Sequence, residues 1–122
     1  MTRLVVAGTP VPKGRPRTTF KNGTAVTYTP QRTRDYEETI RWAARLAHVR
    51  PIDGPVCVTV RFYGANRGDL DNCGKACLDA LNGYGFNDDA QVEELHIYLT
   101  RKDERPRTEI EVVPLEHGVV SG

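Results

Sequence analysis

The stretch Val56-Cys57-Val58-Thr59-Val60-Arg61-Phe62-Tyr63 decides the fold, because apolar side chains occupy every second position of it. A two-residue period is that of a β-strand with one buried face, and the β-branched valines favour this conformation. Further along, the apolar positions of residues 72–82 recur every three or four residues, which predicts an α-helix that ends before Gly83. The apolar stripe of this helix is Cys73, Ala76, Cys77, Ala80 and Leu81. A strand followed by an amphipathic helix indicates a helix packed on a sheet.

The remaining segments extend this pattern on both sides. Residues 4–7, 95–99 and 110–112 are predicted to form strands, and residues 18–20 and 25–28 a hairpin around Asn22-Gly23, a pair that tolerates positive φ. We therefore expect an α/β (α+β) fold in one domain over residues 1–122. Its mixed β-sheet would carry two main helices packed on it.

A longer helix is expected between the hairpin and the strand at residues 56–63, with Thr29 as its N-cap and Pro30 at its first helical position. Pro51 is expected to end it. Its predicted apolar stripe is Tyr36, Ile40, Ala43 and Ala47, widened by Thr39, Trp42 and Leu46. Its predicted polar face holds Arg34, Glu37, Glu38, Arg41, Arg45 and His48.

Charge is distributed unevenly along the 122 residues. The whole chain has 17 Lys and Arg against 16 Asp and Glu, but residues 1–50 carry a net +7 and residues 51–100 a net −5. This split suggests that one segment binds a polyanion while another uses carboxylates. No apolar run approaches the ~20 residues of a membrane helix, and three cysteines without a disulfide spacing indicate reduced thiols in a cytoplasmic protein.

The carboxylates gather in two places. Asp69 and Asp71 are two residues apart, so in extended chain they point the same way, and Asp71 is expected to cap the helix that follows. Lys75 and Asp79 follow at steps of four residues, and Asp88-Asp89 precede the next strand. Carboxylates with too few positively charged neighbours favour binding of Mg²⁺, which prefers oxygen ligands. A bound Mg²⁺ can activate a water molecule to attack a phosphodiester. A calcium loop starting at Asp69 is excluded, because Cys73 and Ala80 stand at ligand positions. An ordinary helix cap with surface ion pairs stays open as the alternative.

The motif Asp69-Leu70-Asp71-Asn72-x-x-Lys75-Ala76-x-x-Asp79-Ala80-Leu81, followed by Gly85-x-x-Asp88-Asp89-Ala90-Gln91-Val92, closely resembles the RusA family of Holliday-junction resolvases. The opening Pro12-Lys13-Gly14-Arg15-Pro16-Arg17 is similar to the start of phage-type members, and the resemblance covers essentially the whole chain. Gly68 and Cys73 depart from the family pattern without touching its charged set.

The resemblance implies a homodimer that nicks four-way DNA junctions symmetrically with Mg²⁺ or Mn²⁺. It assigns the essential aspartates to Asp69, Asp71 and Asp89 and the catalytic lysine to Lys75. We interpret Asp88, the first member of the acidic pair, as a residue that supports these metal ligands or as an alternative ligand. Asp79 would orient Lys75. Another Mg²⁺-dependent nuclease acting on flaps or branched DNA, or a non-catalytic junction-binding protein, remains an alternative.

Basic residues outside this motif are the candidate DNA contacts: Lys13, Arg15, Arg17, Arg32, Arg34 and Arg67. Arg32 and Arg34 stand at the start of the longer helix, where the helix dipole disfavours cations, which suggests that they serve DNA. Solvated surface residues are the open alternative for this set. Cys73 and Cys77 share a helix face with alanine and leucine and are expected to be buried thiols rather than zinc ligands.

Overall fold

A computed structural model describes residues 1–11, 13–14, 17–64 and 70–115, with the side chains of residues 70 and 71 left out. Its elements follow in the order β1 (Thr2–Ala7), β2 (Arg17–Lys21), β3 (Thr24–Tyr28), α1 (Gln31–Leu46), β4 (Val56–Tyr63), α2 (Leu70–Leu81), the 3-10 turn η1 (Asp89–Gln91), β5 (Val92–Thr100) and β6 (Arg107–Pro114). The predicted α+β class is confirmed, because a mixed sheet carries both helices.

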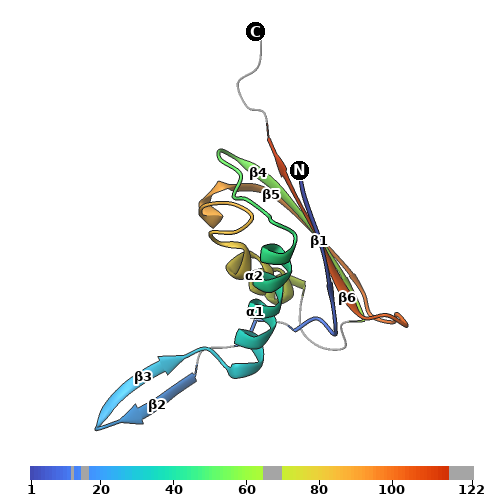
Figure 1. The fold of residues 1–122 in the computed structure, drawn as a ribbon. Coiled ribbons are helices and arrows are strands. Elements are labelled where there is room, and N and C mark those ends of the chain that lie inside the picture. The colour runs from blue at the N-terminus through green and yellow to red at the C-terminus, as the bar shows by residue number, and fades with distance from the viewer. Residues whose placement is uncertain (12, 15–16, 65–69, 116–122) are drawn as a thin grey trace.

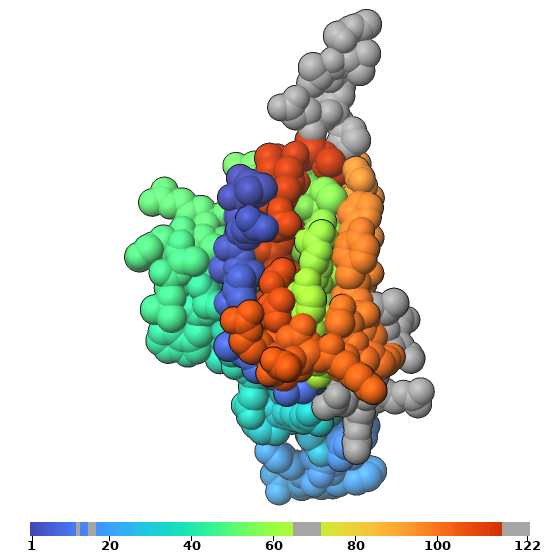
Figure 2. Space-filling view, turned by 90° about the vertical axis from the view of Figure 1, so that its right-hand side faces the viewer, coloured from blue at the N-terminus to red at the C-terminus, as the bar shows by residue number. Residues whose placement is uncertain are grey.

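Four strands form the main sheet in the order β1-β6-β4-β5, and β2 and β3 form a separate two-stranded hairpin. β4 pairs antiparallel with β6 and parallel with β5, and β1 pairs antiparallel with β6. Both helices lie on one side of this sheet (Figure 1), where α1 contacts α2 and β1 and α2 contacts β5. The opposite face, turned to the viewer in Figure 2, shows β1, β6, β4 and β5 side by side with no described helix over them.

The core lies between the sheet and the two helices. The alternation predicted for residues 56–63 is confirmed, since Val56, Val58, Val60 and Phe62 are fully buried. The predicted stripe of α2 is confirmed as well, because Cys73, Ala76, Cys77, Ala80 and Leu81 are completely inaccessible to solvent. Burial of each large apolar side chain stabilises such a core by about 1.5–3 kcal/mol.

The start of α1 differs from the prediction. Pro30, with ψ 144°, is the residue before the first helical turn, and it makes no side-chain capping hydrogen bond. Thr29 is therefore not the N-cap. The helix also ends at Leu46, five residues before Pro51, and His48 follows it with φ 55°.

The buried face of α1 is rotated from the predicted stripe. It consists of Thr33, Tyr36, Glu37, Ile40 and Ala44, whereas Trp42 and Leu46 are exposed. Glu37 was expected on the polar face, but it is only 6% exposed. Its buried carboxylate is paired with the ammonium group of Lys13. Trp42 stays near the surface, where the Arg45 guanidinium lies 5.3 Å from its ring centre.

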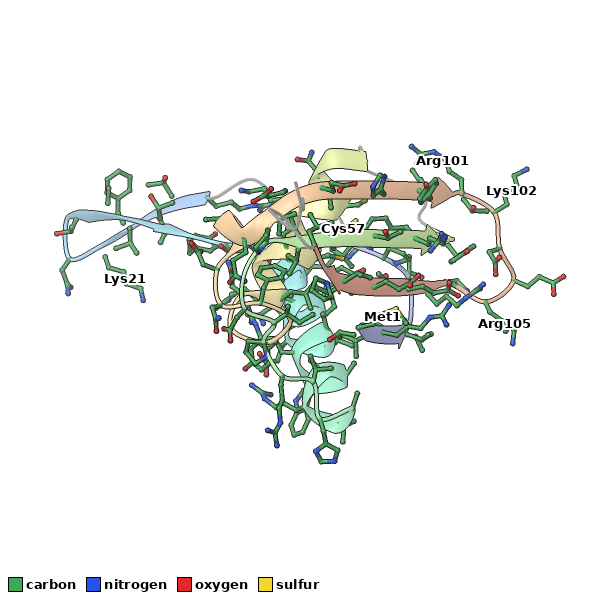
Figure 3. The ribbon with its side chains drawn as sticks, turned by 90° about the horizontal axis from the view of Figure 1, so that it is seen from above. Met1, Lys21, Cys57, Arg101, Lys102 and Arg105 are labelled. Carbon is green, nitrogen blue, oxygen red and sulfur yellow. The ribbon has the colours of Figure 1, made fainter. Side chains whose placement is uncertain are left out.

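The hairpin β2–β3 stands away from the main sheet (Figures 1 and 3). Asn22 and Gly23 have φ of 51° and 79°, as the predicted two-residue turn requires. All ten strand residues of the hairpin are exposed, and the Phe20 side chain is 74% exposed. The hairpin therefore adds nothing to the core and presents its surface to solvent.

Candidate active site

Helix α2 provides the first part of the candidate site. It begins at Leu70, earlier than the predicted start, so Asp71 lies within its first turn and is not its N-cap. The expectation that Asp71 shares an extended backbone with Asp69 fails for the same reason, because its backbone is helical. A carboxylate in the first turn is still stabilised by the positive end of the helix dipole. Asp69, Arg15 and Arg67 lie outside the described residues, as does the side chain of Asp71.

Lys75 lies on the solvent side of α2, one turn after Asp71. The neighbouring Gly74 is buried, and a Cβ built on it would come 2.4 Å from Cδ1 of Ile97 on β5. A glycine at this position thus lets α2 approach β5 closely. The close approach holds the exposed lysine near the edge of the sheet.

The second part of the site is η1, which contacts α2 on the helix-bearing side of the sheet. Asp88 is its N-cap and Asp89 its first residue, and both carboxylates are exposed. Exposed carboxylates at a helix-like N-terminus remain available to a cation and to solvent.

Gln91 holds this turn in place, a role that was not predicted from the sequence. Its Oε1 accepts hydrogen bonds from the backbone N–H groups of Asn87 (2.7 Å) and Asp88 (2.9 Å). Its Nε2 donates to the carbonyl oxygens of Ile52 and Gly54, each at 2.7 Å. Gln91 therefore joins the Asp88-Asp89 turn to the loop before β4. The spacing of Asp88 and Gln91 is that of a capping box and was the available sequence signal.

Lys13 is bound within an ion-pair cluster between the two helices. Its Nζ lies 2.7 Å from Oε2 of Glu37 on α1 and 3.0 Å from Oδ2 of Asp79 on α2. Its backbone N–H donates to the carbonyl of Asn72 at 2.9 Å, and the N–H of Gly14 donates to Oγ1 of Thr33 at 3.0 Å. Residues 13–14 thereby link α1 to the first turn of α2.

Asp79 consequently pairs with Lys13 and not with Lys75, since no ion pair within the described part of the chain joins Asp79 to Lys75. Burial alone would lower the pKa of Lys13, but the hydrogen bonds and charges of Glu37 and Asp79 outweigh it and raise that pKa. Lys13 therefore stays charged, with its ammonium directed to carboxylates of its own chain. No sequence signal pointed to Glu37 as its partner.

The other described basic candidates are exposed. Arg17 begins β2, and Arg32 and Arg34 lie in the first turn of α1, where no acidic residue is found. Arg34 donates to the side chain of Gln31, its neighbour one turn earlier. These arginines remain candidates for phosphate contact.

Two separate chain segments thus supply exposed charged groups on elements that contact each other: Lys75 on α2 and the Asp88-Asp89 carboxylates at η1. Carboxylates beside a cation are a donor set that metal-dependent phosphodiester cleavage can use. A family model described as Endodeoxyribonuclease RusA matches residues 7–113, which is most of the chain. The chain belongs to the RusA endodeoxyribonuclease family.

One curated protein is similar to this chain over most of its length. The uncharacterized protein YqaN of Bacillus subtilis (strain 168) is 29% identical over 134 aligned positions, which cover 88% of this chain and 92% of that protein.

Among the described residues, no helix has the length and apolar character needed to cross a bilayer.

Proposed function

We propose that this protein is a metal-dependent resolvase that cuts four-way DNA junctions by symmetric nicking. The observation that carries this function is the contact between η1 and α2, which brings the element bearing Asp89 against the helix bearing Asp71 and Lys75. Membership of the RusA family across residues 7–113 supports the endonuclease chemistry.

The ligand set proposed for the metal is Asp69, Asp71 and Asp89, with Asp88 as a further or alternative donor. Carboxylate oxygens are the donors that Mg²⁺ and Mn²⁺ prefer, so the residue types fit the ion. The bound ion would activate a water molecule and polarise the scissile phosphate. This set is supported by the hydrogen bonds of Gln91, which hold the turn that carries Asp89 through the backbone N–H of Asp88 and the carbonyl of Ile52, and by the position of Asp71 in the first turn of α2.

Lys75 is proposed to stabilise the negative charge that develops on the phosphate. It is exposed on α2 and is not paired with Asp79, so its ammonium group is free of that carboxylate. A cation aimed at developing charge lowers the barrier more than one that binds the substrate uniformly.

A homodimer would present two such sites to opposite strands of a branched substrate, which is what symmetric nicking requires. The exposed basic residues Arg17, Arg32 and Arg34, together with Arg15 and Arg67, are the proposed phosphate contacts. A DNA substrate of this kind places the protein in the cytoplasm of a bacterial or phage-infected cell.

The test compares Asp71→Asn and Asp89→Asn with the matched control Asp35→Asn, an exposed aspartate on α1. Four-way, flap and linear duplex substrates are assayed with and without Mg²⁺. The expected result is metal-dependent paired nicks in the four-way junction by the wild type and by Asp35→Asn. Both site variants should bind the junction without cutting it.

Preferred cleavage of flaps would replace junction resolution with a different nuclease activity. Junction binding without any nicking by the wild type would indicate a non-catalytic binding protein. Retained cleavage in Asp71→Asn would overturn the site assignment.

A further inference from the structure

A second group of metal-ligating side chains lies on the sheet face opposite the helices. It consists of Cys57 on β4 and of Glu94 and His96 on β5, whose ligand atoms all lie within 4.8 Å of one another. Nε2 of His96 is 3.5 Å from Oε1 of Glu94. Cys57 is half-buried, and the other two side chains are exposed. Figure 3 labels Cys57, and Figure 2 shows the open face formed by these strands.

Strand register brings the three side chains together. In the parallel pair, Cys57 is the partner of Glu94 and Thr59 the partner of His96, with a register irregularity just before Cys57. Residues 94 and 96 are two apart on one strand, so they point to the same face as Cys57. Adjacent strands hold ligand positions more rigidly than loops do, which favours a defined coordination geometry.

The chemistry of these donors differs from that of the aspartate set. A thiolate, an imidazole and a carboxylate are the ligands of Zn²⁺ and related divalent transition metals, whereas Mg²⁺ takes oxygen ligands. We propose that Cys57, Glu94 and His96 bind one Zn²⁺ ion per chain, with solvent in the fourth position. This site lies across the sheet from α2 and does not depend on the proposed nuclease function.

The position of this ion in the fold defines its effect. β5 is an edge strand and begins directly after η1, so among the described strands β4 alone pairs with its first residues. A metal bridging Cys57 to Glu94 and His96 would fasten this part of β5 to β4. Metal binding to the native state alone stabilises it by mass action. The ion would therefore stabilise the sheet edge from which the Asp88-Asp89 turn leaves.

Cobalt provides a direct spectroscopic test on the full chain after chelator treatment. Co²⁺ bound to a thiolate gives a sulfur-to-cobalt charge-transfer band, together with the visible bands of tetrahedral coordination. Cys73 and Cys77 are fully buried on the other side of the sheet, so only Cys57 can supply that band. We expect a band that saturates at one Co²⁺ per chain and is bleached by added Zn²⁺. Zn²⁺ should also raise the melting temperature and protect one thiol from alkylation.

Variants identify the ligands. Cys57→Ser should abolish the charge-transfer band, and Glu94→Gln and His96→Gln should weaken Zn²⁺ binding by at least ~10-fold. His48→Asn is the matched histidine control, because Asn tolerates the positive φ at that position. Asp89→Asn should leave the band unchanged, which separates this site from the aspartate site. A wild type without the band, or a band that survives in Cys57→Ser, would overturn the proposal.

Discussion

Lys13 and Asp79 form an ion pair, with Nζ 3.0 Å from Oδ2, between the segment before the hairpin and the last turn of α2. The same ammonium lies 2.7 Å from Glu37 on α1. One lysine from the basic N-terminal segment thus joins the two helices. The pair also occupies the carboxylate that was expected to orient Lys75.

Replacing Lys13 should destabilise the fold. In Lys13→Met the carboxylate of Glu37, whose side chain is 8% exposed, loses its closest partner, which should lower the free energy of unfolding by about 2 kcal/mol. Urea denaturation measures this, with Arg17→Ala as the exposed control, expected to change stability by less than ~0.5 kcal/mol. Equal stabilities of the two variants would contradict a structural role for Lys13.

Gln91 should control catalysis through the position of the Asp88-Asp89 turn. Gln91→Glu keeps the acceptor for the Asn87 and Asp88 N–H groups but loses the donors to Ile52 and Gly54. We expect junction cleavage to fall by roughly 10- to 100-fold, with junction binding unchanged, because the turn loses its support rather than its carboxylates. Single-turnover nicking rates and gel-shift affinities measure the two effects. A loss of binding equal to the loss of rate would contradict this role.

Lys75→Gln should separate catalysis from stability. The side chain is exposed on α2, so its replacement should change the free energy of unfolding by less than ~0.5 kcal/mol. The cleavage rate should fall by about 10²- to 10³-fold, the effect of removing one stabiliser of developing charge. Lys75→Arg should retain part of the rate. The single-turnover rate and the melting temperature are the two measurements, and an unchanged rate in Lys75→Gln would exclude the residue from the chemistry.

The hairpin should contribute electrostatically to DNA binding. Arg17 and Lys21 belong to β2, and the hairpin of β2 and β3 stands apart from the core (Figure 3). Neither strand of this hairpin contains an acidic residue. In the double variant Arg17→Ala and Lys21→Ala, the slope of log K against log salt should decrease in magnitude by about 1–2. Lys13→Met should leave that slope unchanged, since its ammonium is paired internally. Fluorescence anisotropy over a salt series tests both statements, and a slope unchanged in the double variant would remove the hairpin from the DNA contacts.

The buried thiol of Cys77 should make the protein less stable in alkali. Burial raises the pKa of Cys77 from 9.0 to about 12. Between these values the unfolded chain binds fewer protons than the folded chain, so the free energy of unfolding falls as the pH rises from 9 toward 12. Burial raises the pKa of the neighbouring Tyr36 as well, which acts in the same direction.

Cys77→Ala should flatten this decline, whereas Cys57→Ala, at a half-buried position, should retain it. Urea titrations at pH 8, 9, 10 and 11 measure the slope. A decline that is as steep in Cys77→Ala as in the wild type would contradict the assignment to this thiol.

Local pattern was sufficient for the elements whose burial is periodic. The strand at residues 56–63 and the stripe of α2 follow from apolar spacing, and the hairpin turn follows from Asn22-Gly23, because these features depend on neighbouring residues alone. The chemistry expected of the site likewise follows from residue type and spacing, because most of its charged residues fall within the short segment 69–79.

The buried face of α1 did not follow from local pattern. Glu37 carries a charge, yet its side chain is buried, because the ammonium group of Lys13, which is 24 residues away in the chain, pairs with its carboxylate. The same lysine pairs with Asp79, which was expected from the sequence to orient Lys75. Gln91 holds the Asp88-Asp89 turn through hydrogen bonds to the carbonyl groups of Ile52 and Gly54. These groups come within reach of its side chain because β4 and β5 pair.

The sequence by itself therefore determined which residues could form strands, helices and a carboxylate-rich site, since periodicity and residue type are local properties. Tertiary structure decided which charges pair and which remain available. An ion pair or a polar hydrogen bond depends on distances of a few ångströms between segments that are remote in the chain, and only the packing of α1 and α2 on the sheet sets those distances.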